Sequence, residues 1–256
     1  MLKEKIGVVL GVANKRSISW NIAKAADREG ARLVITYQGE RLLRGIKELC
    51  EQQLTQEPIL VPCDVSSDEQ MDVLFETIRS ECGALDFLVH GLAFSKREEL
   101  MGAFHDSTLE NWRLAMQISA YSLSALTRRA VPLMEGRRGS ILTLTYIGGE
   151  RVIPHYNVMG ACKAALEASV RYLAVDLGPH GHRVNGISAG PIKTLAAAGV
   201  RGFSQMLDVV ASRSPMQRNV EAAEVGDAAL FFLSDLSRAV TGDVLFVDCG
   251  YHAMGI

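Results

Sequence analysis

Short runs of apolar residues alternate along the chain with longer stretches in which apolar residues recur every three or four positions. The runs predict strands near residues 6–10, 31–36, 58–61, 86–89, 139–144, 182–187 and 243–247. The longer stretches predict helices near residues 18–29, 39–53, 68–81, 108–134, 155–178 and 221–235. Strands that are apolar on both faces and alternate with helices are typical of a parallel sheet covered on both sides. We therefore predict an α/β fold with a doubly wound parallel sheet of about seven strands.

The composition suits one large domain that spans residues 1–256. The 256 residues are 48% hydrophobic and 22% charged, and no stretch reads as a linker. The formal net charge of −2, without a run of Lys or Arg, predicts binding neither to nucleic acid nor to a membrane. The five cysteines are scattered, so we expect reduced thiols and no metal site. No signal peptide and no apolar run of about 20 residues is visible, which predicts a cytoplasmic protein.

A glycine-containing turn follows the first predicted strand and leads into the first predicted helix. Gly11 allows a sharp turn, the small Ala13 lets backbone approach a ligand, and Ser17 stands where a helix N-cap is expected. Such a helix start favours a pyrophosphate, so the turn predicts a dinucleotide site in a Rossmann-like fold. The motif is incomplete, because Ala13 replaces a glycine and Gln38, not an acidic residue, follows the second strand. The alternative is structural: Gly11 ends a strand and Ser17 caps a helix.

Residues after the third and fourth strands also suit a ligand at the carboxyl edge of the sheet. Asp64 would accept a hydrogen bond from an adenine amino group beside an apolar wall at Val65. An Asx turn or a helix cap explains the same aspartate equally well. The small residues between His90 and Phe94 would let a nicotinamide nucleotide lie against the backbone, although a plain turn explains them nearly as well.

A Gly-Pro break follows the sixth predicted strand. Gly190 and Pro191 most often form only a turn, but Thr194 just beyond them offers a hydroxyl to a phosphate. The stretch near residues 195–212 carries small and apolar residues without a strong cap. It predicts either a mobile substrate-binding lid or an ordinary surface helix, and periodicity does not choose between them.

Tyr156 and Lys163 stand seven residues apart, and Tyr146 lies ten residues before Tyr156. At about 3.6 residues per turn, seven residues make nearly two turns, so both side chains would project from one face of a helix that Tyr156 begins. A neutral phenol can donate a hydrogen bond to an oxygen that gains negative charge, and a nearby lysine can stabilise the anion and position a cofactor. The alternative is that Tyr156 is a half-buried aromatic residue and Lys163 a solvated charge.

Taken together, these residues resemble the short-chain dehydrogenase/reductase superfamily, and most closely its bacterial NADH-dependent enoyl-acyl-carrier-protein reductases. The resemblance covers almost the whole chain. Its most specific part is the spacing of Tyr156 and Lys163, since carbonyl reductases of the superfamily have the lysine four residues after the tyrosine, where this chain has Gly160. A ketone reductase is therefore disfavoured. The other matching motifs are Gly11-x5-Ser17-x5-Ala23, Cys63-Asp64-Val65, Ile118-Ser119, Leu144-Thr145-Tyr146, Pro154 to Gly160, and Ile187 to Ile192 with Thr194.

The resemblance implies that the chain reduces the trans-2 double bond of an enoyl thioester on acyl carrier protein, the last step of the fatty acid elongation cycle. NADH would deliver hydride to the β-carbon. Three catalytic residues are implied: Tyr156 on the thioester carbonyl, Lys163 on the nicotinamide ribose and Tyr146 on the substrate side. The expected dinucleotide contacts are Gly11, Ala13, Ser17, Ile18, Gln38, Asp64, Val65, Leu92, Ala93, Lys163, Ile192 and Thr194. The expected substrate contacts are Ala93, Phe94, Tyr146, Tyr156, Met159, Ala196, Phe203 and Met206.

Departures from the family lie close to the expected site. The family usually has glycine at the position of Ala93 and a second serine at Ala120, which bears on nicotinamide packing and on a water-linked proton path. Relatives that prefer NADPH tend to place basic residues directly after the second strand, whereas this chain has Gln38 followed by Gly39 and Glu40. NADH is therefore the expected cofactor and NADPH the less favoured one.

Two other functions stay open at this point. The chain could reduce an enoyl-coenzyme A or another carbonyl substrate, or it could be a catalytically silent dinucleotide-binding sensor, which the presence of both Tyr156 and Lys163 disfavours. The resemblance further implies acyl carrier protein as a partner. It also implies a homotetramer that pairs through the long helices near 108–134 and 155–178.

Overall fold

The computed structural model describes residues 1–194 and 202–255. A 7-stranded parallel sheet lies at its centre, with the strand order β3-β2-β1-β4-β5-β6-β7. The strands are β1 Ile6–Leu10, β2 Arg32–Tyr37, β3 Ile59–Pro62, β4 Phe87–His90, β5 Ser140–Thr145, β6 Arg183–Ala189 and β7 Val244–Val247. The α-helices are α1 Ile18–Arg28, α2 Glu40–Gln53, α3 Asp68–Cys82, α4 Leu109–Met116, α5 Ser122–Met134, α6 Val158–Leu177, α7 Phe203–Arg213 and α8 Ala222–Leu233. The predicted doubly wound, Rossmann-like sheet is confirmed.

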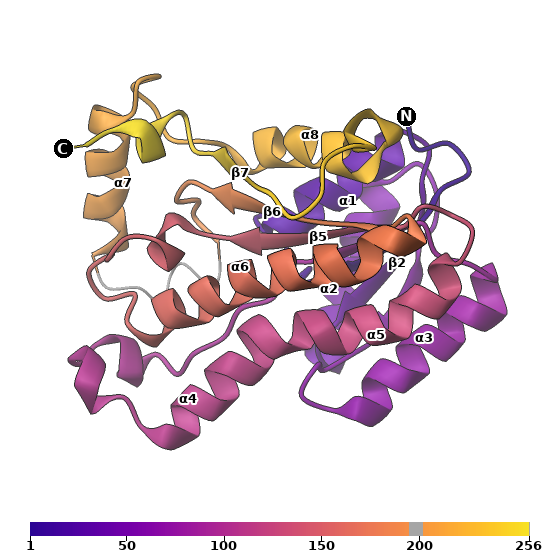
Figure 1. Cartoon of the computed structure of the whole chain (residues 1–256), viewed down its shortest axis with the longest axis horizontal. Helices are drawn as coiled ribbons and strands as arrows, with labels where there is room; N and C mark the ends of the chain where they lie inside the picture. Colours follow the sequence, from indigo (N-terminus) through magenta and orange to yellow (C-terminus); the bar gives the residue numbers. More distant parts are fainter. Residues whose placement is uncertain (195–201, 256) are drawn as a thin grey trace.

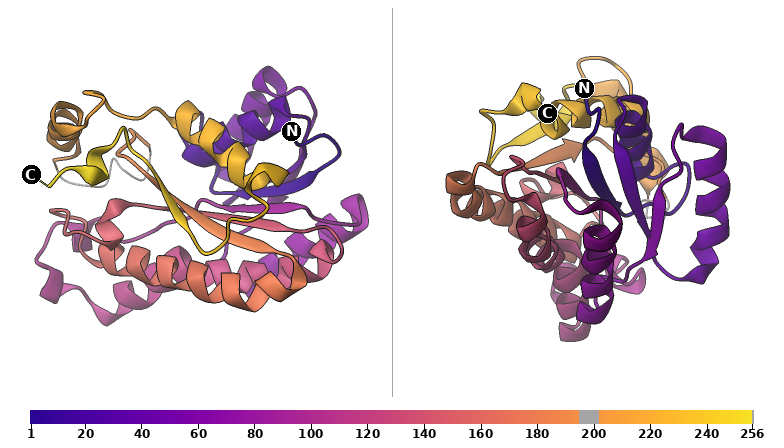
Figure 2. Two further views of the ribbon diagram at one scale, coloured as in Figure 1. Left: turned by 45° about the horizontal axis from the view of Figure 1, so that its top comes forward. Right: turned by 90° about the vertical axis from the view of Figure 1, so that its right-hand side faces the viewer.

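Helices cover both faces of the sheet (Figures 1 and 2). Helices α1 and α8 pack against each other on one face, together with α2, while α3, α5 and α6 cover the other. Neighbouring strand residues serve opposite faces: the fully buried Val8 belongs to the apolar cluster under α3, α5 and α6, and Val9 to the cluster under α1 and α8. This two-sided burial explains why the strands are continuous apolar runs rather than alternating ones.

The sheet order reverses between β1 and β4, and the carboxyl ends of these strands form the switch point at which sheets of this kind have their ligand crevice. The chain builds β1, β2 and β3 outward in one direction and then returns to add β4 on the other side of β1. Leu10 therefore pairs with His90, and Gly11 lies beside Gly91. Gly11 has a φ of +93°, and a Cβ built on it would lie 2.0 Å from the carbonyl oxygen of Gly91. Glycine is required at this switch point, where ligands of such sheets bind.

Two predicted helices are wrong in detail. The single helix expected over 108–134 is interrupted, because a π-helical segment, η3 (Gln117–Tyr121), separates α4 from α5. The helix expected from residue 155 begins instead at Val158, so Tyr156 lies in the turn before α6. At both places a side chain bonds to a distant residue, Ser119 to Phe94 and Asn157 to Glu99 and Gly102, and local periodicity contains no sign of such bonds.

The segment near 195–212 is described in part. Residues 203–213 form α7, which does not decide between a lid and a surface helix, and residues 195–201 lie outside the described residues. Within the part of the chain that the structure describes, no helix combines the length and the apolar character that crossing a membrane requires.

Candidate active site

Tyr146 and Tyr156 meet at the carboxyl end of β5. Tyr146 comes directly after the strand and precedes a short 3-10 turn, η4 (Ile147–Gly149), and Tyr156 follows in the turn before α6. Their rings pack edge to face with centroids 5.2 Å apart and an interplanar angle of 72°. The predicted helical stacking of Tyr156 over Lys163 is therefore wrong, and a turn carries the phenol to the site instead.

Both phenols are held in their neutral form. Burial raises the pKa of Tyr146 to about 12. Burial, with a further contribution from Tyr146, raises the pKa of Tyr156 well above its usual value. A phenol that keeps its proton can donate a hydrogen bond to an oxygen that gains negative charge.

Lys163 is buried at the same edge of the sheet. It is only 5% exposed, which excludes the alternative of a solvated surface charge. Its Nζ donates a hydrogen bond of 2.8 Å to the carbonyl oxygen of Leu144, two residues before Tyr146. Burial lowers the pKa of Lys163 to about 8, although Cys162 and Glu167 oppose the shift. The ammonium uses one donor on the strand and has two more for a ligand.

The turn after β1 is shaped as an anion site. Ser17 is the N-cap of α1, but its Oγ accepts from the backbone N–H groups of Ala13 and Asn14, each over 3.1 Å, and makes no bond to the helix. The first turn of α1, which begins at Ile18, contains no acidic residue. Its leading amides lack intrahelical acceptors because of helix geometry. Ser17 therefore occupies the N-cap position, and its hydroxyl braces the loop instead of the helix. The amides that begin α1 are of the kind that can hold a pyrophosphate.

Gln38 and Asp64 meet across β2 and β3. Gln38 Nε2 donates to Asp64 Oδ2 over 2.9 Å, and Ser66 donates to the other carboxylate oxygen from its amide and its hydroxyl. Burial acts to raise the pKa of Asp64, but the hydrogen bonds from Ser66 and Gln38 lower it below its usual value. The Asx turn considered from the sequence is present, and the carboxylate also faces Gln38. Val65 beside it is buried, so a polar edge and an apolar wall stand together.

The loop after β4 is tied to the π-helical segment by Ser119. The backbone N–H of Phe94 donates to Ser119 Oγ over 2.9 Å, and this hydroxyl lies 3.3 Å from the carbonyl oxygen of Phe94. The bonds fix the chain that runs through Leu92 and Ala93, beside the crevice. Ser119 belonged to a matching motif, but its part in positioning the site depends on the π turn and is not readable from the sequence.

His90 is a buried polar residue that the sequence did not single out as functional. Its Nδ1 lies 2.8 Å from Thr143 Oγ1 and its Nε2 2.8 Å from Ser122 Oγ. Ser122 donates its own proton to the carbonyl of Ile118, so we assign the imidazole proton to Nε2. The Thr143 hydroxyl then donates to Nδ1 at 2.8 Å in preference to the His90 carbonyl oxygen at 3.2 Å. Burial, reinforced by Lys163, lowers the pKa of His90 to about 3. Through these hydrogen bonds the neutral ring of His90, at the end of β4, connects Thr143 of β5 with Ser122 of α5.

Two of the expected substrate contacts, Met206 and Met159, lie beside the tyrosines. The hydroxyl of Tyr146 lies 3.5 Å from the sulfur of Met206, and Met159 is buried in an apolar cluster that Tyr156 packs against. Phe203 begins α7, the helix that also carries Met206. Ile192 packs against the core and accepts from the N–H of Thr194 over 2.7 Å. Ala196 lies outside the described residues.

Comparison with known proteins gives one consistent result. The model of a family described as enoyl-(acyl carrier protein) reductase matches residues 11–252. The chain is 51% identical to the enoyl-acyl-carrier-protein reductase (NADH) FabI of Bacillus cereus, with 100% of this chain and 99% of that protein covered. The structure of the Bacillus cereus reductase with NADP+ and an indole naphthyridinone superposes with a TM-score of 0.96 at 50% identity, covering 100% and 99%. The reductase of Anaplasma phagocytophilum in complex with NAD gives 0.94 at 48% identity, covering 100% and 96%.

Proposed function

Because the chain belongs to the enoyl-(acyl carrier protein) reductase family, we propose that Tyr146, Tyr156 and Lys163 form its active site. The protein is an NADH-dependent oxidoreductase of fatty acid synthesis that reduces the trans-2 double bond of enoyl-acyl-carrier-protein thioesters. The single observation that supports these roles is the buried lysine: Lys163 is anchored on Leu144, and both phenols lie immediately beyond that anchor.

Tyr156 would donate its hydrogen bond to the thioester carbonyl oxygen. When hydride reaches the β-carbon, negative charge moves onto that oxygen, and a donor already in place stabilises the enolate without rearranging. The raised pKa of Tyr156 keeps its proton on the phenol at neutral pH. Tyr146 supports this arrangement because its ring packs against the edge of Tyr156 and restricts its position.

Lys163 would hold the ribose next to the nicotinamide. NADH, when bound, supplies the hydride. The Leu144 carbonyl fixes one N–H of the ammonium, which leaves the other two for ribose hydroxyls. The positive charge also lowers the energy of the enolate that Tyr156 contacts.

The other end of the dinucleotide would lie along the turn after β1 and the Gln38–Asp64 pair. The amides that start α1 suit the pyrophosphate, and the Asp64 carboxylate suits an adenine amino group or a ribose hydroxyl. An acidic group here repels a 2′-phosphate, which supports NADH over NADPH. Arg16 and Arg41 are the cations in this part of the sequence that would favour NADPH.

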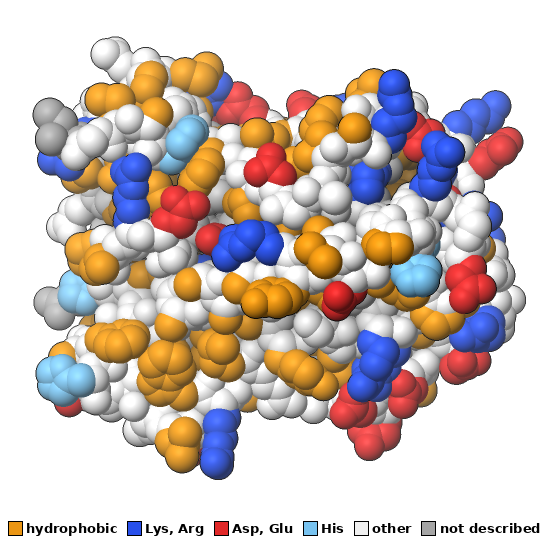
Figure 3. Space-filling model, in the orientation of Figure 1, with side chains coloured by type: hydrophobic (Ala, Val, Ile, Leu, Met, Phe, Trp, Pro, Cys, Tyr) orange, Lys and Arg blue, Asp and Glu red, His pale blue; other side chains and the backbone are white. Residues whose placement is uncertain are grey.

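The acyl chain would lie against Met159, Phe203 and Met206, with acyl carrier protein as the partner that brings it. We also propose a homotetramer in the cytoplasm. Tyr172 and Val175 on α6 are 77% and 74% exposed, and Figure 3 shows apolar side chains gathered along the face formed by α6 and its neighbours. An apolar face of this kind is suited to packing against a second subunit. Light scattering after gel filtration tests the tetramer, and a monomer at micromolar concentration would contradict it.

The deciding assay follows the absorbance of NADH with a trans-2-enoyl thioester and, separately, with a β-ketoacyl thioester. Oxidation with the enoyl compound alone is expected, on acyl carrier protein more efficiently than on coenzyme A. Oxidation with the ketoacyl compound alone would contradict the assigned reaction. NADH binding without oxidation of either would favour the silent sensor.

A further inference from the structure

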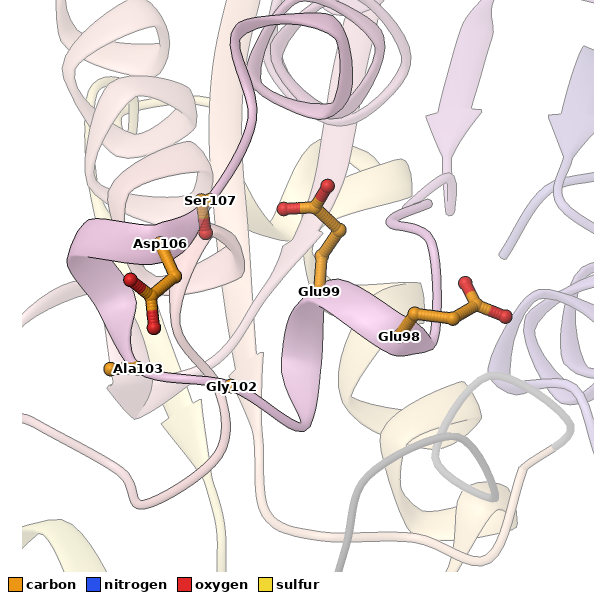
Figure 4. A pocket seen from close by; sticks show the side chains of 6 residues that line it. All are labelled: Glu98, Glu99, Gly102, Ala103, Asp106 and Ser107. Carbon is orange, nitrogen blue, oxygen red and sulfur yellow. The ribbon is translucent and has the colours of Figure 1, made fainter.

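The chain between β4 and α4 forms a wall beside the tyrosines, which we call the wall segment (residues 94–107). It contains two short 3-10 turns, η1 (Glu98–Leu100) and η2 (Phe104–Asp106). Figure 4 shows the hollow between them, with Glu98 and Glu99 projecting from η1 and Asp106 from η2. Leu100 points away from solvent, at 6% exposed, and belongs to an apolar cluster that the ring of Tyr156 packs against. The wall segment therefore shares an apolar cluster with the ring of Tyr156.

Two groups of hydrogen bonds, which we call fasteners, hold the wall segment to α4. The fully buried Asn111 accepts from the amide of Lys96 over 3.0 Å and donates to Ser95 Oγ over 3.1 Å. The Glu99 carboxylate accepts from the amide and the hydroxyl of Thr108, over 2.9 Å and 2.6 Å. These bonds position the segment relative to α4 and place no restraint on Tyr156.

Asn157 supplies a third fastener, from the residue directly after Tyr156. Its Nδ2 donates to the carbonyl oxygen of Glu99 over 3.2 Å and to that of Gly102 over 2.9 Å. One acceptor, Glu99, lies within η1, and the other, Gly102, lies in the bend that follows it. One side chain thus joins the middle of the wall segment to the turn that carries the phenol.

The backbone at Asn157 is strained. Its φ and ψ are 41° and −125°, and His155, on the other side of Tyr156, has a φ of 62°. Residues with a Cβ rarely adopt positive φ, whereas glycine does so freely. Such strain persists only where surrounding contacts determine the conformation, and here the two bonds to the wall segment are the contacts available to this side chain.

On the basis of the proposed function, we propose that Asn157 is a positioning residue that couples the wall segment to Tyr156. The amide holds the wall at the distance that an acyl chain requires, and the same bonds hold the strained turn that aims the phenol. Loss of the amide then releases the wall, and loss of the backbone conformation displaces the hydroxyl. Release of the wall segment should change the KM for the enoyl thioester, and displacement of the hydroxyl should change kcat.

A matched pair of variants separates them. Asn157→Gly removes the amide but accepts the backbone conformation, so we expect the KM for the enoyl thioester to rise about tenfold, as two lost hydrogen bonds imply, with kcat within about threefold of the wild type. Asn157→Ala removes the amide and disfavours the conformation, so kcat should fall about tenfold further. The Kd for NADH should stay unchanged in both. Wild-type KM in both variants overturns the coupling, and equal kcat values overturn the part assigned to strain.

A readout independent of turnover uses Trp112, which packs edge to face on Phe104 of the wall segment with centroids 5.8 Å apart. The chain has two tryptophans, and Trp20 is fully buried, so iodide quenches mainly Trp112. Quenching should increase about twofold in Asn157→Gly, since the segment opens locally. Unchanged quenching contradicts the fastening role.

Leu100→Ala provides a second route if the Asn157 variants fold poorly. It loosens the same segment from the apolar cluster and should raise both quenching and the KM, while a wild-type KM with increased quenching would overturn the link to substrate. A wild-type enzyme that does not turn over enoyl thioesters would refute the proposed function instead, and the quenching comparison still tests the fastener.

Discussion

The two sides of the proposed site are built differently. On the side proposed for the nucleotide (the nucleotide side: the Gly11–Ile18 turn, Gln38 and Asp64), the groups offered to a ligand are backbone amides and partly exposed polar side chains. On the side proposed for reduction (the reduction side: Tyr146, Tyr156 and Lys163), they are ionisable side chains whose pKa values burial has moved. A helix start holds a phosphate with aligned amides that can remain open to solvent, whereas stabilising the charge of an enolate is more effective where water is excluded.

The largest expected effect is on kcat, from a substitution that alters the reduction side alone. Tyr156→Phe keeps the ring and its packing on Tyr146 but removes the donor, so kcat with an enoyl thioester should fall about 100-fold. Stopped-flow NADH oxidation gives kcat, and NADH fluorescence titration should give a wild-type Kd. Retention of full turnover would remove Tyr156 from the chemistry and make the contrast between the two sides untenable.

Lys163→Met tests whether burial of the charge matters for the cofactor as well. Loss of charge-assisted hydrogen bonds should weaken NADH about 30-fold, measured by fluorescence titration. The ammonium is the binding form, so the wild-type affinity should fall as pH rises through about 8, and the variant should lack this dependence. A basic limb that persists in the variant would assign the titration to another group.

The same shift has a consequence for folding. The pKa of Lys163 in the folded protein, about 8, is below its value of about 10.4 in an unfolded chain, which therefore binds more protons between these values. The contribution of Lys163 to the free energy of unfolding should rise with pH across this window. Urea titrations at pH 7.5 and pH 10 measure the free energy of unfolding of the wild type and of Lys163→Met. The wild type should gain stability relative to the variant as pH rises, and equal changes in both proteins would contradict this prediction.

Gln38→Arg tests the nucleotide side, where it should change the preference between NADH and NADPH. A guanidinium beside Asp64 neutralises the carboxylate and can meet a 2′-phosphate, so the ratio of kcat/KM for NADPH to that for NADH should rise about tenfold. The kcat with NADH should change little, because the reduction side is untouched. A proportional loss with both cofactors would indicate that Gln38 shapes the fold and not the choice of cofactor.

The smallest expected effect is that of Asp64→Asn. The amide keeps the size of the side chain and replaces one acceptor, so the Kd for NADH should rise about threefold and kcat should stay unchanged. Isothermal titration measures the first and steady-state assays the second. A decrease in kcat larger than the increase in Kd would mean that Asp64, on the nucleotide side, also affects the reaction on the reduction side.

The same contrast explains what the sequence could predict. The sheet, its two-sided helical cover and the turn at Gly11 follow from apolar runs and from local residue types, and all are observed. The spacing of Tyr156 and Lys163 identified the pair, but the helical geometry inferred for it is wrong, because Tyr156 lies in a strained turn outside α6. The spacing of two residues along the chain can match a family motif. The positions of their side chains depend also on contacts with residues distant in the sequence.

The residues that sequence analysis missed share one physical property. His90, Asn111 and Asn157 act through hydrogen bonds to residues at least 15 positions away, so no local pattern marks them. Ser119, within the π-helical segment Gln117–Tyr121, is of the same kind, since its hydroxyl bonds to Phe94, which is 25 positions away. Long-range polar contacts are therefore the part of this site that required a structure.

The imidazole of His90 has a further consequence for the enzyme in acid. With a pKa of about 3, the ring takes up no proton anywhere between pH 5 and pH 9, although histidine is the side chain that most often titrates there. The hydrogen-bonded chain from Thr143 through His90 to Ser122 keeps the same polarity across that range. Protonation of this imidazole therefore does not alter the link between β4, β5 and α5 over that range, and an acidic inflection in turnover would have to originate outside this chain of bonds.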